Sequence, residues 1–212
     1  MRPLATIAYL LICLLVLPGC YTFSTSYIAP TSTLERIRPV DVDKPLDSAW
    51  TTLIHGLAIS SFDIVTMDRQ SGFVSATCTG DPEEYVDGGE VVFVATSRTA
   101  GGRKDTVRYH AARAETSWTV QALGNSFRAD RQVYLDGKVN IILQEAGAHR
   151  SRMTVNVRYT VTINESRQPP DGEVERTQDV VTFNTGQAGR TPSGVIFQPT
   201  GRLEEAIVGL LR

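Results

Sequence analysis

The longest strict alternation of hydrophobic and polar residues in this chain runs from Arg152 to Asn164. Its hydrophobic positions are Met153, Val155, Val157, Tyr159, Val161 and Ile163. Because successive side chains of a strand point to opposite faces, this pattern predicts a strand of an antiparallel sheet with one covered and one solvent-facing side. The polar face of that strand is a candidate contact surface, formed by Thr154, Asn156, Arg158, Thr160 and Thr162.

Shorter runs with the residue types of strands fill much of the remaining chain. They lie at 62–65, 73–77, 91–96, 106–110, 115–123, 139–143 and 174–184. Turn-forming residues from Asp68 to Gly72 separate the first two runs, and Gln168 to Gly172 precede the last. The runs predict an antiparallel sheet of about six to eight strands.

Two segments show the spacing of a helix face instead. The first carries Leu46, Trp50, Leu53, Ile54 and Leu57, and the second carries Leu203, Ala206, Ile207, Leu210 and Leu211. The first predicts a helix from about Pro45 to Ile59 with Asp43 or Asp47 as its cap, and the second a helix capped by Thr200. A helix, a run of strands and a final helix indicate an α+β fold with both helices on the covered face of the sheet.

The N-terminal end has a different pattern. Residues 4 to 17 form a hydrophobic run behind a single basic residue, Arg2. The run is too short for an ordinary transmembrane helix, which needs about 20 residues. A basic start, a short apolar core and small residues at the cut are typical of a secretory signal, here residues 1–19. The remainder is nearly neutral in charge, and this does not favour nucleic acid as a partner.

The sequence Leu17-Pro18-Gly19-Cys20 resembles the lipobox of bacterial lipoproteins, although Pro18 stands where that family more often has a small residue. The resemblance implies that Cys20 receives a diacylglycerol, becomes the first residue and is acylated. Two or three acyl chains on one residue anchor a protein durably to a membrane. Tyr21 follows where an Asp favours inner-membrane retention in lipoproteins of the enteric type. The expected location is therefore the periplasmic face of the outer membrane.

The segment that follows is rich in Ser and Thr and shows no sustained period. We expect residues 20–39 to be a lipidated N-terminus and tether, which spans roughly 60 Å at ~3.3 Å per residue when extended. The alternative is that part of it adds an edge strand. Residues 40–212 are expected to form a single periplasmic α+β domain.

A second resemblance concerns about 30 residues of the body. Leu46-Asp-Ser-Ala-Trp50 through Leu57, then Ile59 to Val65 and Asp68 to Val74, is similar to the helix-grip domain of envelope lipoproteins of the BamC kind. That family has an antiparallel sheet flanked by two helices and serves as an accessory of outer-membrane protein assembly. The resemblance implies a fold and provides no functional residue to transfer.

Few residues suggest chemistry. Cys78 is the only cysteine outside the signal that lipidation leaves free, and a buried inert thiol is preferred to a nucleophile served by His55 or His110. The three histidines are scattered, and no motif for a metal, a cofactor or a catalytic centre is present. An acidic stretch at 81–90 is expected to be a solvated loop rather than a calcium site. A basic stretch at 98–113 is expected to be an exposed hairpin rather than a site for lipid phosphates or lipopolysaccharide.

The sequence thus favours a non-enzymatic envelope lipoprotein that is tethered through Cys20 and contacts another envelope component. The alternative is a module that binds a lipid or a small apolar ligand between the helices and the sheet.

Overall fold

The computed structural model describes residues 21–32, 34, 38–97, 104–122, 125–169 and 172–212. The predicted signal peptide, the lipidation site Cys20 and the basic residues Arg98 and Arg103 lie outside these residues. No helix within the described ranges is long and apolar enough to cross a membrane.

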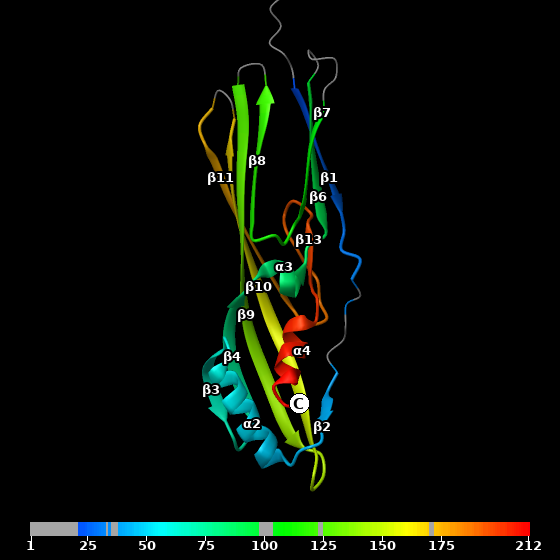
Figure 1. Ribbon diagram of the computed structural model, residues 1–212, viewed down its shortest axis with the longest axis vertical. Helices are drawn as coiled ribbons and strands as arrows, with labels where there is room; N and C mark the ends of the chain where they lie inside the picture. The colour runs from blue at the N-terminus through cyan, green and yellow to red at the C-terminus, as the bar shows by residue number, and fades with distance from the viewer. Residues whose placement is uncertain (1–20, 33, 35–37, 98–103, 123–124, 170–171) are drawn as a thin grey trace, which may run out of the picture.

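A long hairpin forms the axis of an elongated molecule (Figure 1). Its strands are β9 (Asn125–Glu145) and β10 (Ser151–Gln168), in continuous antiparallel register from Glu145 opposite Ser151 to Arg128 opposite Gln168. Each strand changes its outer neighbour part-way along, so the hairpin belongs to two differently built halves.

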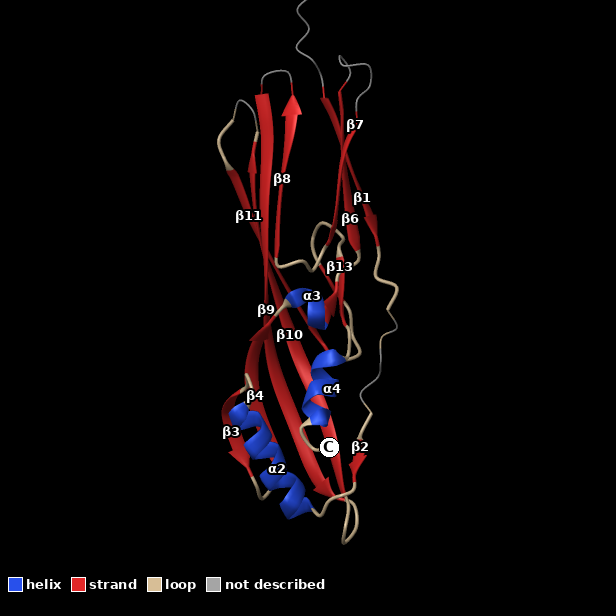
Figure 2. Ribbon diagram, in the orientation of Figure 1, coloured by secondary structure: helices blue, strands red, loops and turns tan. Residues whose placement is uncertain are grey.

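The half nearest the β9–β10 turn is covered by helices, and we call it the helix half. Here β9 pairs with β4, β4 with β3, and β10 with the short β2. The strands are β2 (Val40–Val42), β3 (Asp63–Asp68) and β4 (Phe73–Gly80), and the helices are α2 (Leu46–Ile59) and α4 (Arg202–Gly209). Both helices pack on the apolar face of the sheet (Figure 2), and Gly56 of α2 approaches Leu210 just beyond α4.

The other half consists of two facing sheets, and we call it the two-sheet half. In one sheet, β8 (Glu115–Ala122) and β11 (Glu175–Asn184) flank the hairpin. The second sheet has the order β1-β6-β7, with β1 (Tyr21–Ile28), β6 (Glu90–Ser97) and β7 (Lys104–His110). Short elements lie between the halves, namely α3 (Pro82–Tyr85), β5 (Val86–Asp87), β12 (Gly189–Arg190) and β13 (Ile196–Pro199).

The predicted fold class is confirmed. The main sheet has seven antiparallel strands, and α2 and the C-terminal helix α4 lie on its covered face. The hydrophobic positions of β10 from Met153 to Ile163 are all buried, as the alternation predicts. The single predicted sheet is nevertheless incomplete, because β1, β6 and β7 form a second sheet.

The tether interpretation of residues 20–39 is wrong for its first part. Residues 21–28 form strand β1, in register with all of β6 from Glu90 to Ser97. The hydroxyl of Tyr27 accepts a hydrogen bond from the backbone N–H of Ile196 at 2.9 Å, and Gln198 donates one to the backbone oxygen of Ser32 at 2.6 Å. Small hydroxyl side chains are compatible with a strand whose one face meets solvent. Residues 21–28 therefore belong to the folded body, as an edge strand of the second sheet, which is the alternative that the sequence left open.

The predicted helix caps also differ from the structure. Pro45 is the residue at the N-terminal boundary of α2, and no side chain caps that helix. Asp43 and Asp47 instead form exposed ion pairs with Arg150 and Arg69. Helix α4 begins after Gly201, which adopts a left-handed conformation with φ 83° that favours glycine. The predicted cap Thr200 lies one residue earlier, and its hydroxyl accepts a 3.4 Å hydrogen bond from the backbone N–H of Arg202.

Candidate functional site

The first candidate site is the uncovered face of the main sheet. Both helices and the second sheet lie on the opposite, apolar face, so no other described helix or strand covers the side of β10 that the alternation marks as polar. Arg158 is exposed there, and its four predicted companions Thr154, Asn156, Thr160 and Thr162 are half-buried by their neighbours. A hollow of about 440 Å³ opens beside Arg158 and Lys138.

A hydrophobic row crosses this face in the two-sheet half. Thr162 lies opposite Tyr134 on one side and opposite Val180 on the other. Side chains directly opposite in an antiparallel sheet share a face, so the three project together. Tyr134 is 51% exposed and Val180 57% exposed. Exposed apolar groups within a polar rim are the usual composition of a protein contact site.

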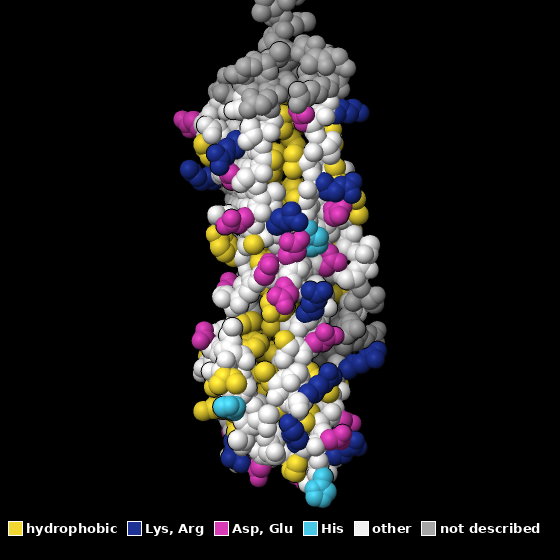
Figure 3. Space-filling model, in the orientation of Figure 1, with side chains coloured by type: hydrophobic (Ala, Val, Ile, Leu, Met, Phe, Trp, Pro, Cys, Tyr) yellow, Lys and Arg dark blue, Asp and Glu magenta, His cyan; other side chains and the backbone are white. Residues whose placement is uncertain are grey.

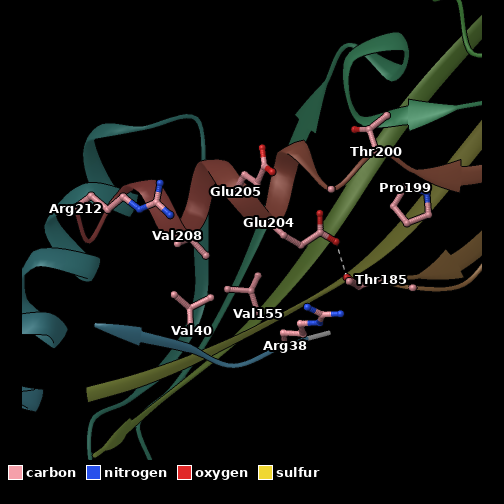
Figure 4. Close-up of a pocket in the computed structure, with 12 residues that line it drawn as sticks. Arg38, Val40, Val155, Thr185, Pro199, Thr200, Glu204, Glu205, Val208 and Arg212 are labelled. Carbon is pink, nitrogen blue, oxygen red and sulfur yellow. Dashed lines mark hydrogen bonds between the residues drawn. The ribbon is translucent and has the colours of Figure 1, made fainter. Parts of the chain in front are cut away.

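The second candidate site is a groove of about 400 Å³ beside α4 (Figure 4). Its apolar wall is formed by Val40 of β2, Val155 of β10 and Val208 of α4. The guanidinium groups of Arg38 and Arg212 lie at its edges. This groove occupies the place between helix and sheet that the ligand-binding alternative requires.

Glu204 lies at the inner end of this groove and is fully engaged by the protein. Its carboxylate accepts hydrogen bonds from the hydroxyls of Tyr159 at 2.7 Å and Thr185 at 2.6 Å. Thr185 in turn accepts a hydrogen bond from the backbone N–H of Val157 at 2.8 Å. Burial, reinforced by the nearby Glu204 carboxylate, strongly raises the pKa of Tyr159. The network fixes α4 against β10, and the other charged side chains that line the groove are Arg38, Arg212 and Glu205.

The third candidate site is an aromatic cluster at the outer end of the two-sheet half. Phe23 of β1 lies 5.7 Å from Phe93 of β6 and 5.6 Å from Phe127 of β9, measured between ring centroids. These three residues, which we call the aromatic cluster, bridge the two sheets. Phe23 is 51% exposed, so the cluster is open at this end.

Further from that end, the inter-sheet contact encloses a charged side chain. Arg131 of β9 is only 6% exposed, and its guanidinium lies 5.7 Å from the ring centroid of Tyr109. Burial lowers the pKa of Arg131, and its Nη1 has no hydrogen-bond partner among the described residues. The sequence pattern does not reveal this residue, because an arginine on the hydrophobic side of a strand interrupts the alternation that marks the core.

Cys78 is a half-buried thiol in β4. Burial, together with the negative charge of Asp136, raises the pKa of Cys78 and therefore disfavours its nucleophilic thiolate form. His55 is exposed on α2. His110 lies in β7, and its Nε2 is 3.4 Å from Oδ1 of Asp87 in β5. Neither histidine is among the groups that shift the pKa of the Cys78 thiol.

The acidic and basic stretches contact each other. Arg108 pairs with Glu90 at 3.0 Å, and Arg113 lies 3.5 Å from Glu83. The stretch 81–90 is thus partly engaged by protein partners rather than wholly solvated. Within the described ranges, no three His, Cys, Asp or Glu side chains converge as metal ligands.

Comparison with protein-family models, with characterised proteins and with solved structures finds no match to this chain.

Proposed function

We propose that this chain is a non-enzymatic lipoprotein of the bacterial envelope, anchored through Cys20 and acting by contact with another envelope protein. The observation that carries the proposal is the uncovered face of the main sheet. It combines the exposed Tyr134 and Val180 with polar and charged groups such as Arg158 and Lys138. Aromatic anchors surrounded by polar groups provide much of the binding energy in protein interfaces.

The closeness of strand β1 to Cys20 favours a fixed orientation of this face relative to the membrane. Strand β1 begins at the residue after Cys20, so an acylated Cys20 holds one end of the elongated body beside the membrane. The outer membrane, on its periplasmic side, is the membrane we propose, from the lipobox and the absence of Asp at position 21. Without the extended tether, the body reaches a partner through its own length.

Site-specific photocrosslinking in cells tests the proposal. A photoreactive phenylalanine analogue replaces Tyr134 on the uncovered face in one strain and Ile59 in another. Ile59 is the matched control because it is 73% exposed but lies at the end of α2. We expect one discrete crosslinked protein from position 134 and none from position 59. A ladder common to both positions, or no adduct from either, would contradict the contact surface.

The anchor itself has a separate test. Cys20→Ala should abolish acyl labelling and release the chain from the membrane fraction. Membrane association that persists in the variant, with no acyl labelling of the parent chain, would refute the anchoring half of the proposal and leave the contact surface to be judged by crosslinking.

The α4 groove supports a second candidate function, binding of a small amphiphilic ligand. Its valine wall and its two edge arginines suit an apolar chain with an anionic end. Native mass spectrometry of the protein purified from its own cells tests this, with Val208→Phe as the variant that fills the groove. A bound mass that the parent carries and the variant loses supports the function. An identical spectrum from both refutes it.

A further inference from the structure

The aromatic cluster lies at the end of the body where the anchored residue must be. β1 runs away from residue 21, and the described ends of β6, β7, β8 and β9 reach the same end of the molecule (Figure 1). Phe23 is three positions after Cys20, a span of about 10 Å in a strand. An acyl chain on Cys20 therefore brings Phe23 to within about 10 Å of the membrane surface.

The side chains of β1 are sorted into two faces at this end. Thr22 and Ser24 are exposed on the outer face of the second sheet, whereas Phe23 points inward to Phe93 and Phe127. The inner face is nevertheless not fully buried, because half of the Phe23 surface stays in contact with solvent. Figure 3 shows a stripe of hydrophobic surface in this half of the molecule.

The described parts of the two sheets bury their aromatic side chains to different extents. Deeper in the same inter-sheet contact, Trp118 stacks on Tyr109 and is 8% exposed, so the two sheets can close over aromatic rings. Within the described residues, Phe93 and Phe127 are half-buried and Phe23 is left 51% exposed. This ring lies only three positions after the proposed anchor, where aromatic side chains favour the membrane interface.

We propose that the aromatic cluster of Phe23, Phe93 and Phe127 is a membrane-contact surface, seated among the lipids of the leaflet that holds the acyl chains of Cys20. This inference rests on the proposed lipid anchor. Aromatic and aliphatic side chains favour the boundary between headgroups and acyl chains, and a second membrane contact beside the anchor strengthens retention. The contact also fixes orientation, since the body then stands on its two-sheet end with α2 and the β9–β10 turn pointing away from the bilayer.

Quenching of tryptophan fluorescence by brominated lipids tests the contact. The full chain is produced in bacteria, its mass is measured to establish acylation, and it is reconstituted into phosphatidylethanolamine–phosphatidylglycerol vesicles with brominated acyl chains. Phe23→Trp places an indole in the aromatic cluster, and Ile59→Trp places one at the end of α2 in the helix half. Both variants retain Trp50 and Trp118, so the parent chain provides the common background.

We expect brominated lipid to quench most of the emission that Phe23→Trp adds and to leave the emission added by Ile59→Trp unchanged. Equal quenching of both variants means that the body lies flat on the membrane, and quenching of neither means that the end stands clear; either result overturns the proposal while the acyl mass keeps the anchor intact. Shielding of position 23 that depends on protein concentration rather than on lipid identifies a second copy as the occupant and also overturns it. A chain without acyl mass refutes the anchor instead.

A second measurement covers the case in which Phe23→Trp does not fold. A nitroxide on Thr22→Cys, and another on Ser60→Cys as control, are compared in a chain that carries Cys78→Ser. Both positions are exposed in the parent. Greater accessibility to membrane-dissolved oxygen at position 22 than at position 60 is expected, and equal accessibility overturns the proposal.

Discussion

The two halves of this molecule share one hairpin but close their cores differently. In the helix half, α2 and α4 cover aliphatic side chains completely, and Leu53, Leu57, Ile141 and Met153 are 0–1% exposed. In the two-sheet half, aromatic rings bridge the sheets, and exposure rises to 51% at Phe23. A helix covers a sheet face along its length, whereas two facing sheets stay open at their end unless a loop or a partner closes them.

The helix half stabilises the fold, whereas the two-sheet half leaves side chains available for contact with other molecules. The helix half buries its core side chains completely, and burial of apolar area is the dominant favourable contribution to folding. The two-sheet half retains what the helix half excludes, namely a buried arginine and an exposed aromatic cluster. A buried arginine and an exposed aromatic ring are unfavourable in a closed core. They are therefore the features for which a functional role should be sought.

The largest effect should come from breaking the closed core. Leu57→Ala is expected to lower the free energy of unfolding by about 3 kcal/mol, because a fully buried leucine leaves a cavity. Phe23→Ala should cost about 1 kcal/mol or less, since much of its surface is already in water. Urea unfolding followed by tryptophan fluorescence measures both, and Trp50 and Trp118 report one half each. Equal losses from the two substitutions would refute the contrast between the halves.

A smaller effect is expected at the junction of the halves. Tyr159→Phe removes a hydrogen bond to Glu204 and should cost about 1–2 kcal/mol at pH 7. The raised pKa of Tyr159 stabilises the fold below the unfolded value of about 10, and this contribution is lost as pH rises above it, because only the unfolded chain releases the proton. The variant should therefore lose less stability between neutral and alkaline pH than the parent. Tyr134→Phe, at an exposed tyrosine, is the control and should follow the parent.

The sequence predicts the helix half better than the two-sheet half, for a physical reason. Helix spacing locates α2 and α4 within one or two residues, and the alternation of β10 identifies its buried face. Both signals arise because these elements bury a continuous apolar face against one layer. The resemblance to helix-grip domains covers only part of this half and extends to no functional residue.

The strands that the sequence pattern does not predict in full, β9 and β1, do not show a continuous hydrophobic alternation. In β9, the prediction reaches only 139–143, whereas the strand runs from Asn125 to Glu145. Arg131 and Gly137 occupy inward-facing positions of β9 and interrupt its hydrophobic period. In β1, serine and threonine resemble a linker, because the partner strand that defines β1 lies more than 60 residues away. The uncovered face was predictable from β10 alone, but its hydrophobic row required the register of three strands.

A substitution at Arg131 should change the free energy of unfolding by at most an intermediate amount. Arg131→Met should leave the free energy of unfolding unchanged or raise it by up to about 1 kcal/mol, because a hydrophobic residue of similar length avoids the cost of burying a charge without a full set of partners. Thermal unfolding of the two chains at the same pH measures this. Arg128→Met is the control, since Arg128 is exposed in the same strand. A loss above about 2 kcal/mol would mean that Arg131 is well satisfied, and the two-sheet core would then be as closed as the helix half.

The smallest effect is expected where the segment after β1 is attached to the two-sheet half. Burial alone would raise the pKa of Asp87, but hydrogen bonds from the Gly89 backbone N–H and the Ser32 hydroxyl, with the nearby His110, hold it below its usual value. A lowered carboxyl pKa adds stability above about pH 4 and loses it as pH falls further, because the unfolded chain takes up the proton first. Asp87→Asn should therefore cost no more than about 1 kcal/mol at pH 7, since solvent screens the group, and less at pH 3. Unfolding at both pH values, with the exposed Asp47→Asn as control, decides the matter: an equal loss at pH 7 and pH 3 would show that packing, rather than charge, attaches this segment to the open half.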